Sequence, residues 1–183
     1  EKEIFTLIGP KRYEAPWKEI EQMGWIAEAE CYEIRVPLEK GLFADYVKSA
    51  GREKYRISSQ NPAKYEVVKD LVRKHAGEKV LVIGQYLDQL NEISEELNAP
   101  LITGKTPHIE RLRLYGLFKH GGLNVLVVSK VANFAIDLPD ANVAIQISGT
   151  FGSRQEEAQR LGRVLRPKNG RKAKIYTIIT RST

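Results

Sequence analysis

Residues 62–179 alternate between amphipathic helical segments and short apolar segments, and this alternation limits the fold more than any other feature. The helical segments lie at 62–75, 87–97 and 107–119, and the apolar segments lie at 79–83, 100–103, 124–129, 143–148 and 174–179. Apolar strands separated by helices are typical of a parallel sheet that is covered by helices on both faces. The pattern therefore predicts an α/β domain with five core strands.

The first 60 residues follow a less regular pattern. Residues 29–38 alternate in the manner of a strand, and residues 39–59 are rich in Lys and Arg and have the pattern of a helix broken at Gly51. We therefore expect two parts. Residues 1–60 form an N-terminal extension with a short helical insertion that packs on the core, and residues 61–183 form the core domain itself.

Composition narrows the function classes. Lys and Arg number 29 against 23 Asp and Glu, a net charge of +6 that favours a polyanionic partner such as a nucleic acid.

The single Cys31 and three scattered His residues exclude a disulfide within the chain and a zinc site built on several cysteines. No apolar run approaches the roughly 18 residues of a membrane span. We expect no metal site and no membrane segment. Because the chain does not start with Met, we also expect it to be a fragment.

A short helix predicted within residues 152–166 gathers polar groups on one side. At about 100° per residue, Gln159, Gly162, Arg163 and Arg166 share one face, and apolar side chains lie opposite. Two guanidinium groups one turn apart suit the oxygens of a transferring phosphoryl group. The same spacing also fits a solvated basic helix end, which the helix dipole favours. The spacing alone leaves both interpretations open.

Three polar residues lie at or after the end of the apolar segment 124–129, where ligand groups of parallel sheets are found. Ser129 and Lys130 can offer a hydroxyl, an N–H and a positive charge to a phosphate. Asp137 can accept a hydrogen bond from a ribose hydroxyl or hold an arginine in place. Equally, Ser129 can bond to its own backbone, and Asp137 can open a turn before Pro139.

The sequence Gly104-Lys105-Thr106 is similar to the end of a phosphate-binding loop but does not fit one. The first glycine of GxxxxGK[ST] falls at Ala99, and the spacer contains the apolar strand itself. A phosphate loop places its whole turn after the strand. We therefore reject this site, and no acidic pair follows an apolar strand to hold Mg²⁺.

Two longer runs identify a family. The pattern Gln159-x-x-Gly162-Arg163-x-x-Arg166 resembles motif VI of superfamily 2 helicases. The strings SKVANFAIDLP (129–139) and GTFGSRQEEAQRLGR (149–163) are similar to XPB-type DNA repair helicases of the bacterial and archaeal-like branch. The resemblance covers most of the chain and implies a RecA-like C-terminal motor domain, with a parallel sheet in three layers and an irregular N-terminal extension.

The resemblance also implies roles on the nucleotide side. Arg163 and Arg166 would be arginine fingers that reach across a cleft to ATP, while Gln159, Gly162 and Asp137 would lie next to the nucleotide. ATP with Mg²⁺ would be bound mainly by the first RecA-like motor domain of the full-length protein, which this chain does not include. Many helicases carry Gly where this chain has Ala135, so the nucleotide-side geometry is expected to differ there.

On the nucleic-acid side, the resemblance implies contacts to DNA from a second set of residues. These are Gln85, Thr103, Gly104, Arg111, Ser129 and Lys130. The expected partners are DNA, the first motor domain, and a repair nuclease or other repair proteins, in the nucleoid-associated cytoplasm if the source is prokaryotic. The alternative function is a non-catalytic module that binds nucleic acid or protein and retains a RecA-like fold.

Overall fold

The computed structural model describes residues 29–129, 141–148 and 172–181. In chain order the elements are β1 (Ala29–Val36), the 3-10 helix η1 (Lys40–Leu42), α3 (Phe43–Lys48), α4 (Gly51–Ser59), α5 (Ala63–Lys74), β2 (Val80–Gly84), α6 (Leu87–Glu96), β3 (Leu101–Ile102), α7 (His108–His120), β4 (Val125–Ser129), β5 (Val143–Gln146) and β6 (Ala173–Thr180). Three of the helices predicted after residue 61 are confirmed as α5, α6 and α7, with each end within one residue of its prediction, and the fourth, within residues 152–166, lies outside the described residues.

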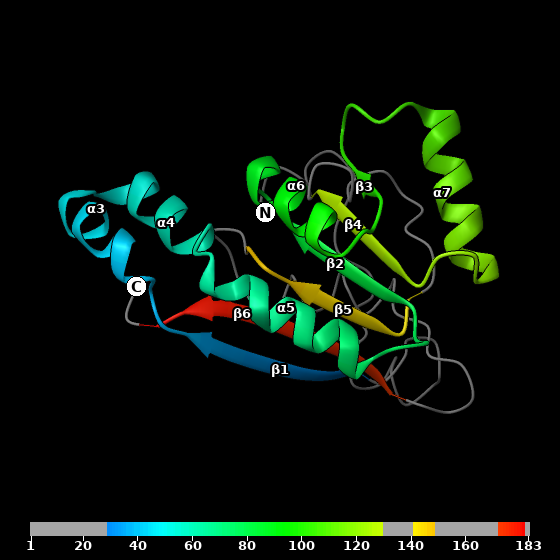
Figure 1. The fold of residues 1–183 in the computed structure, drawn as a ribbon, viewed down its shortest axis with the longest axis horizontal. Coiled ribbons are helices and arrows are strands. Elements are labelled where there is room, and N and C mark those ends of the chain that lie inside the picture. Colours follow the sequence, from blue (N-terminus) through cyan, green and yellow to red (C-terminus); the bar gives the residue numbers. More distant parts are fainter. Residues whose placement is uncertain (1–28, 130–140, 149–171, 182–183) are drawn as a thin grey trace, which may run out of the picture.

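The strands form one sheet in the order β1-β6-β5-β2-β4-β3, and every pair is parallel (Figure 1). The predicted parallel sheet is confirmed, but it has six described strands rather than five. The additional strand is β1, which pairs with β6 along its whole length, from Ala29 opposite Ala173 to Val36 opposite Thr180. Its polar alternation suits this place, because a strand at the edge of a sheet keeps much of its surface in solvent.

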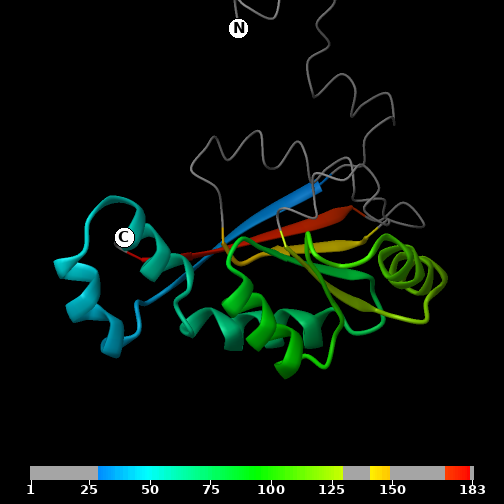
Figure 2. The ribbon, with the colours of Figure 1, turned by 90° about the horizontal axis from the view of Figure 1, so that it is seen from above.

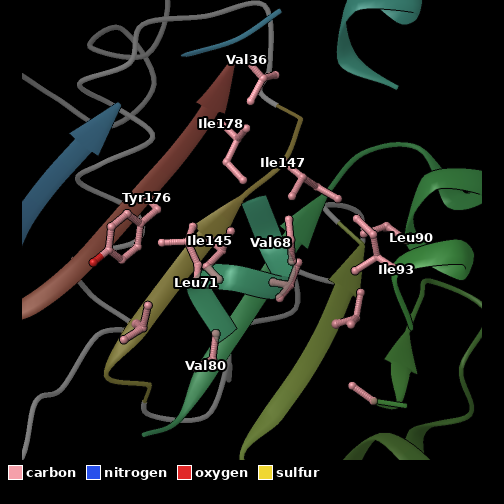
Figure 3. Close-up of a cluster of buried hydrophobic side chains, with 14 residues drawn as sticks. Val36, Val68, Leu71, Val80, Leu90, Ile93, Ile145, Ile147, Tyr176 and Ile178 are labelled. Carbon is pink, nitrogen blue, oxygen red and sulfur yellow. The ribbon is translucent and has the colours of Figure 1, made fainter. Parts of the chain in front are cut away.

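Helices cover both faces of the sheet, and β2 shows why. Leu81 and Ile83 belong to the core cluster that includes Phe118 of α7. Val80 and Val82 belong to the other cluster, which includes side chains of α5 and α6. These two helices lie on one side of the sheet in Figure 2, and Figure 3 shows Val80 within the cluster. Successive residues of a strand face opposite sides, so a strand that is buried on both sides must be apolar throughout. The three-layer arrangement thus follows from the continuous apolar segments.

The elements η1, α3 and α4 form a helical arm (residues 40–59) that extends past the carboxyl ends of β1 and β6 (Figure 1). The helix predicted over residues 39–59 is interrupted at residues 49–50, and Gly51 starts α4 with a φ of 53°. Glycine adopts this left-handed conformation without steric cost. The arm carries five Lys and Arg residues against two Asp and Glu residues, so it is a basic projection.

Candidate functional site

The carboxyl ends of the parallel strands meet at one edge of the sheet, which we call the carboxyl edge. Gln85 directly follows β2, Thr103 follows β3, and Ser129 ends β4. Gly84 lies opposite Ser129 in the register of β2 with β4, and β5 flanks the other side of β2. The fold therefore brings Gln85 and Ser129 onto neighbouring strand ends, with Thr103 one strand further along.

Gln85 is held to the end of β5 by its backbone. Its N–H donates to Oγ of the buried Ser148, with 2.6 Å between N and O. Just before it, a Cβ on Gly84 would lie 2.9 Å from Ile147 Cγ1 and from Leu90 Cδ2. A side chain at this position would displace them, so glycine lets Ile147 and Leu90 of α6 pack closely against the end of β2. The Gln85 side chain is left exposed at the carboxyl edge.

Ser129 lies deeper than a phosphate contact requires. Its side chain is 1% exposed, and among the described residues its Oγ has no hydrogen-bond partner. The bond to its own backbone that the sequence also allowed is therefore not seen in this part of the chain. Ser129 occupies the predicted strand end, but its hydroxyl is enclosed by the fold.

The loop after β3 uses its own polar groups internally. Thr106 Oγ1 accepts the Thr103 N–H at 2.9 Å, and Thr103 Oγ1 accepts the Lys105 N–H at 3.2 Å. The half-buried Arg111 donates through Nη2 to the carbonyls of Thr103 and Thr106, at 3.4 and 3.3 Å. Two amides that a phosphate cradle would need are thus occupied. This agrees with the rejection of Gly104-Lys105-Thr106 as a phosphate loop.

A buried polar cluster behind the carboxyl edge was missed by the sequence analysis. Asn61 is fully buried, and its Nδ2 donates to the Pro37 carbonyl at 2.8 Å and to Thr180 Oγ1 at 3.2 Å. Thr180 Oγ1 in turn donates to the Ser58 carbonyl at 2.7 Å. These bonds connect the end of β1, the end of β6 and the end of α4, so the base of the helical arm is fixed to the sheet.

Lys64 is the charged member of this cluster. Its Nζ donates to the Ile147 carbonyl at 2.8 Å and to the Ser59 carbonyl at 3.1 Å. Its burial lowers the pKa of the ammonium to about 8, so the group is mostly charged at neutral pH. A sequence signal did exist: Lys64 starts the stripe that Val68 and Leu71 continue at helical spacing, a stripe that points into the core.

Six of the predicted site residues lie outside the described residues. On the nucleotide side these are Asp137, Gln159, Gly162, Arg163 and Arg166, and on the nucleic-acid side Lys130. Their roles stay predictions. In the part of the chain that the structure does describe, no cluster of three or more His, Cys, Asp or Glu residues could hold a metal ion. No helix in that part is both long and apolar enough to cross a membrane.

Comparison with known proteins identifies relatives over the whole chain. The family model described as the ERCC3/RAD25/XPB C-terminal helicase matches residues 20–183. A protein of Kineococcus radiotolerans named DNA 3'-5' helicase XPB is 56% identical over 100% of this chain and 33% of its own length. A protein of Antonospora locustae, named general transcription and DNA repair factor IIH helicase/translocase subunit XPB, is 39% identical over 100% of this chain and 28% of its own length. The chain thus spans about a third of these relatives or less.

A solved structure shares the fold. The C-terminal domain of the DEAD-box protein Dbp5 superimposes with a TM-score of 0.61 at 17% identity, over 85% of this chain and 78% of that chain. This likeness confirms the RecA-like fold class. The motif resemblance is confirmed by the family match and by the close relatives, since identity above 50% extends over the full chain. The chain belongs to the ERCC3/RAD25/XPB helicase family and represents its C-terminal helicase domain.

Proposed function

We propose that this chain is the second motor domain of an ATP-dependent DNA helicase or translocase that works in DNA repair. The observation that carries the proposal is the family match over residues 20–183, together with bacterial relatives named DNA 3'-5' helicases that align along the entire chain. The repair role is supported by the name of the Antonospora locustae relative, a subunit of a general transcription and DNA repair factor. In a prokaryote the protein would act in the nucleoid-associated cytoplasm, with other repair proteins as partners.

On the nucleotide side, Arg163 and Arg166 stabilise the charge that develops on the γ-phosphate of ATP, and Gln159, Gly162 and Asp137 line the same cleft. ATP with Mg²⁺ is held mainly by the first motor domain. The closed loop at residues 103–106 supports this division, because its Thr103 and Lys105 amides are already bonded to threonine hydroxyls. Mg²⁺ bound by the first motor domain would neutralise part of the phosphate charge. This chain supplies the arginines.

On the nucleic-acid side, the carboxyl edge carries the DNA track. Gln85 is exposed there at the end of β2, and the loop with Thr103 and Gly104 follows the edge strand β3, with β4 between them. Arg111 and Lys130 add positive charge. Residues of this kind contact phosphates, so binding depends little on the DNA sequence. The affinity for DNA falls as the salt concentration rises. The net charge of +6 agrees with a polyanionic partner.

The proposal is tested with the full-length protein and the variants Arg163→Ala, Arg166→Ala and Arg163→Lys. We expect ATP turnover to fall by roughly 10³ to 10⁵, as for arginine fingers in other phosphoryl-transfer enzymes. Lysine does not restore turnover, because a point charge cannot make a two-pronged contact with phosphate oxygens. DNA binding without nucleotide stays unchanged.

The matched control is Arg73→Ala, which removes an exposed arginine of α5 whose only described ion pair is with Asp70 at 3.2 Å. Its turnover should equal that of the wild type. If the two finger variants instead keep turnover within a few-fold while DNA binding collapses, residues 152–166 form a nucleic-acid surface. The binding-module alternative would then be favoured.

A further inference from the structure

Lys64 is a buried charge that the proposed function does not use. The side chain is 3% exposed, and among the described residues no carboxylate forms a salt bridge with it. Removing an ammonium from water is costly unless hydrogen bonds compensate. A methionine would fill a similar volume without that cost. What a methionine cannot do is donate to two carbonyl oxygens.

The first carbonyl that Lys64 binds is at the end of β5. The pairing of β5 with β2 ends with Gln146 opposite Ile83, after which the Ile147 N–H still donates to the Ile83 carbonyl at 3.0 Å. The Ile147 carbonyl lies beyond the ladder in a fully buried residue, and a buried carbonyl needs a donor. Lys64 Nζ supplies it at 2.8 Å. Two residues later the chain enters the segment 149–171, which contains Arg163 and Arg166.

The second carbonyl belongs to Ser59, the last residue of α4. The final carbonyls of a helix have no partner within the helix, and a positive charge is favoured there. Lys64 Nζ donates to this oxygen at 3.1 Å, and the buried Gln89 Nε2 of α6 donates to it at 2.8 Å. The neighbouring Ser58 carbonyl is taken by Thr180. One ammonium thus joins the base of the basic helical arm to the end of β5.

We propose that Lys64 is a positioning residue that couples the helical arm to the strand end leading into the arginine segment, so that DNA held by this domain changes the rate of ATP turnover. The inference rests on the proposed function. Ser59 of the arm and Ile147 at the strand end lie far apart in sequence, and Lys64 Nζ donates to the carbonyls of both residues. A displacement of α4 is therefore passed to the Ile147 carbonyl through the Lys64 ammonium, which bonds to both.

The test compares Lys64→Met with Lys74→Met in the full-length protein. Lys74 is an exposed lysine of the same helix α5, so its replacement makes the same change in charge and composition. The measured quantity is the ratio of ATP turnover with saturating DNA to turnover without DNA. This ratio does not change if part of a destabilised variant is merely unfolded. We expect Lys64→Met to lower the ratio by about tenfold, within the usual range of coupling between sites, and Lys74→Met to leave it unchanged.

A second measurement does not depend on turnover. Amide hydrogen exchange should become faster at Ile147 and Gln85, whose N–H groups bond across the β2–β5 end, and stay unchanged at Val143 near the start of β5. If Lys64→Met does not fold, Lys64→Gln, which keeps a shorter neutral donor, is measured in the same way with the same expected direction.

The outcomes separate the two proposals. Faster exchange together with a lower ratio supports the coupling role. Faster exchange with an unchanged ratio, in a protein whose wild type is stimulated by DNA, makes Lys64 a purely structural contact and overturns the inference while the proposed function stands. Exchange that stays the same at Ile147 overturns it as well. A wild type without any DNA-stimulated turnover contradicts the proposed function itself.

Discussion

Gly84 lets two side chains pack closely against the end of β2 at the carboxyl edge. The space that its Cβ would need is occupied by Ile147 Cγ1 and Leu90 Cδ2, each 2.9 Å away, and both side chains are fully buried. Protein interiors are packed as densely as organic crystals, so these side chains cannot retreat freely. Gly116 in α7 is the opposite case, because a Cβ there meets no atom within 4 Å.

We therefore predict opposite effects for the same substitution at these two glycines. Gly84→Ala should lower the free energy of unfolding by about 1–3 kcal/mol, the usual cost of overpacking. Gly116→Ala should raise it by about 0.5–1 kcal/mol, because alanine is the better residue in a helix interior. Urea unfolding followed by circular dichroism measures both values. A Gly84→Ala protein as stable as the Gly116→Ala protein would show that Ile147 and Leu90 do not pack as tightly against Gly84 as described.

Helix α7 and the loop before it act as one element, because Arg111 of the helix bonds the loop carbonyls of Thr103 and Thr106. The Arg111 guanidinium therefore has a structural role, because it holds this loop against the helix. Arg113, two residues later, is exposed and forms a two-pronged ion pair with Glu110, at 2.8 and 2.7 Å. The pair lowers the pKa of the Glu110 carboxyl through that hydrogen-bonded contact. The two arginines of one helix thus face different partners.

From this difference we predict that Arg111→Ala weakens binding to all DNA sequences by a similar factor and lowers the salt slope of binding by about 1, as expected for one phosphate contact. With Lys130→Ala added, the slope falls by about 2. Arg113→Ala is the control on the same helix and should change neither quantity. Fluorescence anisotropy over a salt series gives the slopes. Loss of binding to a single sequence, or no loss at all, would mean that the track is elsewhere.

The whole chain provides one side of the proposed nucleotide cleft. Its described residues contain no group suited to a metal ion, and the loop that resembles a phosphate site is closed by its own threonines. The chain spans 33% of the Kineococcus radiotolerans relative, so the remaining two thirds of such a protein have room for the first motor domain. In the proposed function, ATP turnover depends on contact between the two motor domains.

For the chain on its own we predict no ATP turnover, with or without DNA, and no tight binding of ATP. The groups that hold the β- and γ-phosphates and Mg²⁺ belong to the first domain in this proposal. A phosphate-release assay on the purified chain checks the first statement, and calorimetric titration with ATP checks the second. The control is the full-length protein in the same assays. DNA-stimulated turnover that Lys105→Ala abolishes would restore the loop at residues 103–106 as a phosphate site.

Much of the fold was readable from the sequence because its signals are local. Helices α5, α6 and α7 follow from apolar residues at helical spacing, and the core strands follow from continuous apolar segments between them. The family followed from contiguous motifs at residues 129–139 and 149–166. The family match and relatives that align along the whole of this chain confirm it. The positions of Gln85, Thr103 and Ser129 at one edge followed from the parallel sheet.

Other features depend on contacts between residues far apart in the chain, which no local pattern encodes. Strand β1 pairs with β6 across more than a hundred residues, so its place in the sheet was not visible from its alternation. Ser129 appeared available at a strand end, but the packing around β4 encloses it. The helical spacing of Lys64 with Val68 and Leu71 places it on the buried stripe of α5, but this spacing does not show which groups bind its charge. Lys64 is buried because the carbonyls of Ser59 and Ile147, brought together by the closed fold, offer its charge two hydrogen bonds in place of water.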